Sequence, residues 1–314
     1  MNKTLLLIPS VTVLLFVETI LVTLLSILFL KAVSILIRYK RHSTSSAQYA
    51  LEKESYLLSS FVQITLFIYF PFLLFFIYIL NDLSSIVPGA MCAAGVISSN
   101  DYGEFLVVLK FVIAIALPLW LAFHKEDVKT RRQIYFEKKL YFFLLLYLLI
   151  IAAYVLEILF LTHINTQSVV SCCSIIYDTQ EQIIPFSKNT LAALFYLNFI
   201  VIIFALVYKK KILLISASVL FLYLSYLSIT YFFGLYIYEL PSHHCPYCIL
   251  SKDYYFIGYF IYGTLVLSTY YALSAALFGF VSNVIKKALF FYIFFIVLLS
   301  FKLLYYYFVN HTLL

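Results

Sequence analysis

"LYFFLLLYLLIIAAYVLEILFLT", residues 140–162, is a continuous apolar run in which Glu157 is the one acidic residue. A helix rises about 1.5 Å per residue, so about 20 residues cross a hydrocarbon core about 30 Å thick. The run is therefore long enough to span a membrane. Similar runs recur along the chain, which predicts an all-α polytopic bundle of about eight spans at residues 5–37, 56–80, 105–123, 140–162, 189–208, 212–239, 253–283 and 288–309.

The composition agrees with a membrane protein. The chain has 314 residues, of which 65% are hydrophobic and 11% charged, with a mean hydropathy of +1.03. A soluble domain of this size could not bury that much apolar surface. We therefore expect residues 1–314 to form a single integral membrane domain in contact with the lipid bilayer. The net charge of +7 does not indicate nucleic-acid binding, because lysines and arginines in membrane proteins mostly set the orientation.

The basic residues predict that orientation. Fifteen of the 21 lysines and arginines lie in alternate connections, at residues 38–55, 124–139, 209–211 and 286–287. The opposite connections and the N-terminus carry only Lys3, Lys188 and Lys252. Because basic connections stay on the cytoplasmic side, both termini are expected to face outward from the inner (plasma) membrane. The outer loops are then residues 81–104, 163–188 and 240–252.

All the cysteines fall in these three predicted outer loops: Cys92, Cys172, Cys173, Cys245 and Cys248. The outer face of a bacterial-type inner membrane is an oxidising compartment, which favours disulfide chemistry or metal binding there. Cys172 and Cys173 are adjacent, with Cα atoms about 3.8 Å apart, below the usual disulfide range of about 4.4–6.8 Å. We therefore expect each of them to have another partner, with Cys92 as the candidate.

Cys245 and Cys248 form a C-x-x-C motif close to the predicted start of the seventh span. At a helix N-terminus the thiolate of the first cysteine is stabilised by backbone N–H groups, and His244 could assist it. The same motif is compatible with a structural disulfide. It is also compatible with a soft-metal site for Cu or Zn, whose ligands would be His243, His244, Cys245 and Cys248.

The string "CPYCILSK", residues 245–252, resembles the first redox site of the quinone-linked disulfide-bond oxidases of the bacterial inner membrane, the DsbB family. The vitamin K epoxide reductases share the same general logic. The resemblance covers about residues 245–265. It implies that Cys245 and Cys248 are the pair next to a quinone. It also implies that Lys252 stands where the family has an arginine in contact with the quinone.

Two ionisable residues lie inside predicted spans. Lys110 and Glu157 are each five residues from the outer end of a span, which is about 7–8 Å deep. Ionisable groups at such a depth are usually paired or functional. A Lys110–Glu157 pair could line a pocket for a quinone head group or a path for protons.

These observations favour a thiol–disulfide oxidoreductase in which Cys245 and Cys248 exchange electrons with a second centre built from Cys92, Cys172 and Cys173. Quinone is the candidate cofactor, and an extracytoplasmic thiol or redox protein is the candidate partner. One alternative is a protein that binds or transfers a soft metal. Another is a non-enzymatic subunit of a membrane complex, held to other membrane subunits, with disulfide-stapled loops. No Walker or Rossmann glycine motif is present, which argues against nucleotide-driven chemistry.

Overall fold

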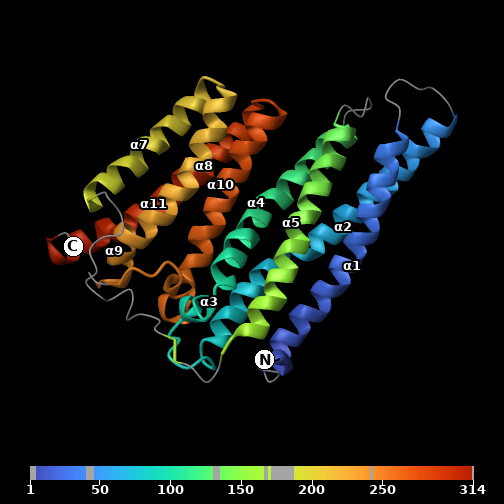
Figure 1. Ribbon diagram of the computed structural model, residues 1–314. Coiled ribbons are helices and arrows are strands. Elements are labelled where there is room, and N and C mark those ends of the chain that lie inside the picture. The colour runs from blue at the N-terminus through green and yellow to red at the C-terminus, as the bar shows by residue number, and fades with distance from the viewer. Residues whose placement is uncertain are drawn as a thin grey trace. The chain divides into compact units, whose positions relative to one another are not determined.

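The structure is a computed structural model that describes residues 5–39, 46–129, 135–165, 169–170, 187–240 and 243–312. Every regular element in these ranges is helical, which confirms the all-α prediction (Figure 1). Eight helical segments are long and apolar enough to cross a membrane, as predicted. They are α1 (Pro9–Arg38), α2 (Ser46–Leu83), α4 (Tyr102–Lys129), α5 (Phe136–His163), α7 (Lys188–Val207), α8 and its continuation (Lys211–Tyr238), α10 (Ile257–Phe278) and α11 (Ser282–Asn310).

Large apolar side chains cover the outward faces of these helices. Phe67 of α2 is 72% exposed, and Phe301 of α11 is 62% exposed. Exposure of such side chains is unfavourable in water and favourable in hydrocarbon. A helix suits that environment because it satisfies its own backbone hydrogen bonds. Pro71 and Pro118 lie inside α2 and α4, a position that membrane helices tolerate. The chain is therefore a multi-pass membrane protein.

The chain divides into two compact units. Unit 1 comprises Met1–Val87 and Val96–Ser168, and unit 2 comprises Pro88–Gly95 and Val169–Leu314. In unit 1, α1 packs against α2 and α5, and α4 packs against α5 and α2. These four helices run side by side (Figure 1).

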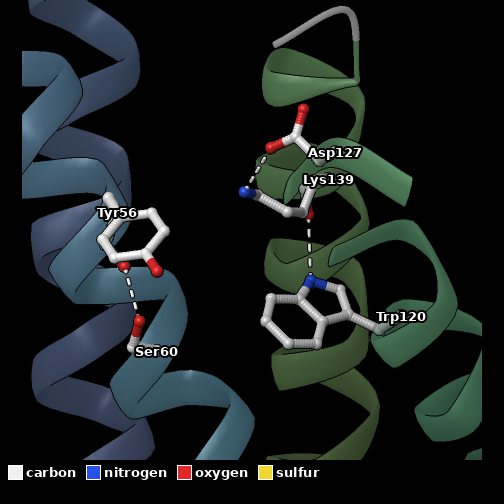
Figure 2. Close-up of polar contacts among 5 residues, drawn as sticks. All are labelled: Tyr56, Ser60, Trp120, Asp127 and Lys139. Carbon is white, nitrogen blue, oxygen red and sulfur yellow. Dashed lines mark hydrogen bonds and ion pairs between the residues drawn. The ribbon is translucent and has the colours of Figure 1, made fainter. Parts of the chain in front are cut away.

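A buried ion pair joins the ends of α4 and α5 (Figure 2). Lys139 Nζ lies 2.6 Å from Asp127 Oδ2, and both side chains are about 5% exposed or less. The indole Nε1 of Trp120 donates a hydrogen bond of 3.1 Å to the carbonyl oxygen of Lys139 (Figure 2). Lys139 is one of the basic residues that predict the orientation, yet its side chain is buried inside unit 1.

Unit 2 is built from α7, α8, α10 and α11. The helix α8 (Lys211–Ser228) continues through a π-helical turn, η2 (Ile229–Phe233), into α9 (Gly234–Tyr238). An aromatic cluster of fully buried rings fills the space between these helices, with ring centroids 5.1–6.3 Å apart; it comprises Phe195, Phe221, Phe233, Tyr292 and Phe295. Pairs of aromatic rings at such distances stabilise a core beyond their buried area.

The segment Pro88–Gly95 belongs to unit 2, although the chain on both sides of it belongs to unit 1. The amide of Val170 donates a 2.9 Å hydrogen bond to the carbonyl oxygen of Pro88. Gly89 has a φ of +82°, and a Cβ atom there would lie 2.3 Å from the carbonyl oxygen of Val170. Only glycine fits both the left-handed backbone and this close approach. The contact anchors the segment that carries Cys92.

The seventh span differs from the expected 253–283. Two 3₁₀ turns, η3 (Cys248–Leu250) and η4 (Lys252–Tyr254), precede α10, which begins only at Ile257. Tyr255 and Phe256 have φ values of 53° and 55°. This left-handed conformation cannot continue a right-handed helix. The span is therefore shorter than the sequence suggested.

Candidate functional site

Three cysteine side chains of unit 2 converge on one point. The Sγ atoms of Cys92, Cys245 and Cys248 all lie within 4.8 Å of one another, and Cys92 Sγ lies 3.8 Å from Cys245 Sγ. The residues are 4%, 0% and 8% exposed. Electron exchange between the C-x-x-C motif and a centre that contains Cys92 would require the two to be close, and the structure shows that Cys92 and Cys245 are. We call these three residues the thiol cluster.

Two tyrosine hydroxyls hold the loop that carries the motif. Tyr238, the last residue of α9, donates a hydrogen bond to the carbonyl oxygen of Cys245, and its hydroxyl accepts one of 3.2 Å from the amide of Ile249. Tyr262 of α10 donates a 2.7 Å hydrogen bond to the carbonyl oxygen of Pro246. Because backbone groups of Cys245, Pro246 and Ile249 are satisfied by side chains of two helices, the loop has a defined shape. Neither tyrosine was singled out from the sequence.

A glycine brings α10 against the same loop. A Cβ atom on Gly258 would lie 2.8 Å from the carbonyl oxygen of Ile249, which is closer than real Cβ contacts. The first turn of α10 therefore packs directly on η3, the turn that begins at Cys248. This contact limits movement of Cys248 relative to α10.

The thiols of Cys245 and Cys248 differ in acidity. Thiol hydrogen bonds from Cys248 and Cys92, with amide hydrogen bonds from residues 247 and 248, lower the pKa of Cys245 well below that of an ordinary thiol. The same thiol interactions raise the pKa of Cys248, and burial raises it further. Negative charge in the thiol cluster is therefore favoured on Cys245.

The source of this stabilisation is not the one expected. The sequence suggested that the motif lies in or just before the first turn of the seventh-span helix. In the structure Cys248 begins a single 3₁₀ turn, and α10 starts nine residues later at Ile257. The left-handed residues Tyr255 and Phe256 separate the two. Neighbouring thiols and loop amides, rather than a helix dipole, stabilise the thiolate.

The two histidines before the motif make contacts with other groups. His243 is 6% exposed, and its ring packs edge-to-face on Tyr238 with centroids 4.3 Å apart. His244 Nδ1 lies 3.4 Å from the carbonyl oxygen of Thr230, in the π-helical turn, and burial lowers the pKa of His244. Among the described residues, the group that could share one metal ion contains the three cysteines and neither histidine.

The remaining predicted site residues fall into three cases. Lys252 lies exposed in η4, and its proposed contact with a quinone stays a prediction. Cys172 and Cys173 lie outside the described residues. Lys110 and Glu157 belong to unit 1, where the predicted pair is confirmed: Lys110 Nζ lies 2.6 Å from Glu157 Oε2.

Lys110 has a second acidic partner, Glu18, which was not identified from the sequence. Glu18 Oε1 of α1 accepts a 3.0 Å hydrogen bond from Lys110 Nζ, and Glu18 is fully buried. One acidic residue in a helix of otherwise uncharged residues up to Lys31 was the signal that could have identified it.

Comparison of the chain with protein families, curated proteins and solved structures found no match.

Proposed function

We propose that this membrane protein binds a soft metal ion, Cu(I) in preference to Zn(II), at the thiol cluster. The observation that carries the proposal is the convergence of three cysteine Sγ atoms within 4.8 Å of one another. Thiolates are the ligands that select soft metal ions.

The spacing of the sulfur atoms suits a shared ion. A zinc–sulfur bond is about 2.3 Å, so sulfurs around one such ion would be about 3.8 Å apart in a tetrahedral site and about 4.0 Å apart in a planar trigonal site. Cys92 Sγ and Cys245 Sγ are 3.8 Å apart, far beyond the about 2.05 Å of a disulfide bond. An ion could thus be accommodated with small movements of the sulfurs.

The number of ligands and their burial favour a copper ion. Structural zinc sites are almost always four-coordinate, whereas the described residues place three sulfurs here. The cysteines are at most 8% exposed. A protein disulfide must reach a sulfur atom to react with it, whereas a small ion needs much less access. If the predicted orientation holds, the metal is exchanged with the outer side of the membrane.

Thiol–disulfide exchange is the second candidate function, and the thiolate-stabilising contacts of Cys245 favour it. In this reaction the Cys245–Cys248 dithiol would lose two electrons and two protons to a quinone or a protein disulfide and would form one S–S bond. The thiolate of Cys92 is then close enough to attack Cys245 Sγ, which would form a Cys92–Cys245 disulfide and release Cys248 as a thiolate. The resemblance of residues 245–252 to quinone-linked oxidases supports the same reading.

The test begins with the full-length protein, purified in detergent under reducing, oxygen-free conditions and loaded with Cu(I). We expect one ion per chain at this site, and protection of Cys92, Cys245 and Cys248 from alkylation in peptide mass spectra. Met91→Leu is the matched control, because the side chain of Met91 carries a soft thioether next to Cys92 in the sequence but is 78% exposed and lies outside the thiol cluster. It should bind copper as the wild type does.

The same preparations distinguish exchange from metal binding. In the metal-binding reading, Cys245→Ser and Cys248→Ser weaken copper binding alike and trap no covalent intermediate. In the exchange reading the two variants differ, because one cysteine attacks and the other resolves, so one variant accumulates a reductant-sensitive mixed disulfide. A trapped mixed disulfide, no bound copper and cysteines that remain open to alkylation would together overturn the metal-binding proposal and favour thiol–disulfide exchange.

A further inference from the structure

The membrane-embedded part of unit 1 contains a buried charge cluster that the thiol chemistry does not use. It consists of Glu18 on α1, Lys110 on α4 and Glu157 on α5, with exposed fractions of 0%, 5% and 0%. Lys110 Nζ lies 3.0 Å from Glu18 Oε1 and 2.6 Å from Glu157 Oε2. The ring of Phe76, on α2, lies below the ammonium group at 4.4 Å. We call these three charged residues the carboxyl–lysine cluster.

The charges of the carboxyl–lysine cluster do not balance. One ammonium group faces two carboxyl groups, so the cluster carries an excess negative charge if both acids are ionised. An uncompensated charge is very unfavourable in a dry, low-dielectric environment. One further positive charge is therefore required, and both carboxyl groups lie within 3.0 Å of the same ammonium nitrogen, so a single proton can serve the pair.

Unsatisfied polar atoms point to the same conclusion. Among the described residues, Glu18 Oε2, Glu157 Oε1 and the hydroxyl of Tyr69 are buried without a hydrogen-bond partner. Tyr69, on α2, is fully buried and interacts electrostatically with all three members of the carboxyl–lysine cluster. Buried polar atoms are rarely left unpaired, and a proton on one carboxyl group supplies a donor for the other.

The carboxyl–lysine cluster lies near one end of its helices, so a proton could reach it from one side of the membrane. Glu157 is six residues from the end of α5 at His163, and Lys110 is eight residues from the start of α4 at Tyr102. At about 1.5 Å per residue these positions are about 9–12 Å from the helix ends. The two ends lie together, because Asn100, just before α4, donates a 3.0 Å hydrogen bond to the carbonyl oxygen of Phe160 in α5.

We propose that Glu18 and Glu157 form a proton-binding site that holds one exchangeable proton at neutral pH beside Lys110. The titratable groups that face the site are Tyr69 from α2 and Lys110 from α4, in addition to the two acids on α1 and α5. Carboxyl groups inside membrane helices commonly serve as proton relays. This site gives unit 1 a proton-linked role that uses none of the residues of the thiol cluster.

Infrared spectroscopy of the full-length protein tests the site through the C=O stretch of a protonated carboxyl group. At neutral pH we expect one such band, shifted by ¹³C-labelled glutamate and by transfer into D₂O. Glu18→Gln and Glu157→Gln should each abolish it, because the remaining carboxylate then balances Lys110. The control Glu104→Gln, at an exposed acid in the first turn of α4, should leave it unchanged.

Removal of the Lys110 ammonium group should strengthen the carboxyl band instead of abolishing it. Lys110→Met leaves two buried acids without a positive charge, so the band should about double in intensity. Where this variant fails to fold, Glu18→Gln/Lys110→Met keeps a single acid and should show one band.

Four outcomes would overturn the proposal. They are a wild-type protein without the band, a band that survives Glu18→Gln or Glu157→Gln, a band that does not respond to D₂O, and a band that sodium ions remove. The last outcome would assign the site to a metal cation instead of a proton.

Discussion

Replacement of Cys92 by serine removes one of the three sulfurs of the thiol cluster and changes little else. Serine is nearly isosteric, but its hydroxyl is a poor ligand for a soft ion. A four-ligand structural zinc site contributes about 10–16 kcal/mol, or about 2.5–4 kcal/mol per ligand. At about 1.4 kcal/mol per factor of ten, loss of one ligand should weaken Cu(I) binding by about 60- to 700-fold. Cys92 is 4% exposed, so water has little access to take the place of the lost sulfur.

Competition against a coloured Cu(I) chelator, without oxygen and in detergent, gives the Kd of each variant. Met91→Leu is the control for a change at the neighbouring soft side chain and should keep the wild-type Kd. Cys245→Ser should lose affinity to a similar degree as Cys92→Ser. A Kd for Cys92→Ser equal to that of the wild type would show that Cys92 is not a ligand, and the three-sulfur site would be wrong.

Three further measurements test other parts of the structure. Asp127→Asn leaves a buried lysine without its partner and should destabilise unit 1 by about 3–5 kcal/mol. Glu126→Gln breaks the exposed Lys129–Glu126 pair and should change the unfolding temperature in detergent very little. Equal effects of Asp127→Asn and Glu126→Gln would contradict the burial of the Lys139–Asp127 pair. Because burial lowers the pKa of His244, the unfolded chain takes up a proton first on acidification, so stability should fall below about pH 6.5. His244→Gln should reduce this fall, and an unchanged pH dependence of the unfolding temperature would exclude the histidine as its cause. In a cysteine-free chain, Lys252→Cys should react with an impermeant thiol reagent from outside and Lys210→Cys should not, and the reverse pattern would invert the predicted orientation.

The eight spans could be predicted from the sequence, because a helix in hydrocarbon must be long and apolar along its own consecutive residues. Their limits were less predictable. The start of α10 moved to Ile257 because Tyr255 and Phe256 adopt a left-handed conformation that these residue types do not signal. The burial of Lys139 was also hidden, since its partner Asp127 lies on a different helix, α4.

The candidate sites were predictable only in part. The gathering of all cysteines in the predicted outer loops identified Cys92, Cys245 and Cys248 as candidates. Their convergence depends on Pro88–Gly95 packing with unit 2, and no local pattern encodes that. Neither histidine next to the motif joins the three cysteines among the described residues, although adjacency in the chain suggested it.

The sequence by itself determined that this is a helical membrane protein and which residue types its chemistry can use. Those are properties of composition and of consecutive residues, and the hydrophobic effect acts on them directly. The tertiary structure alone decided which residues meet: Cys92 with Cys245 across 153 positions, and Glu18 with Lys110 across 92. Ligand sets and charge balance depend on side chains from several helices, so they appear only when packing brings those helices together.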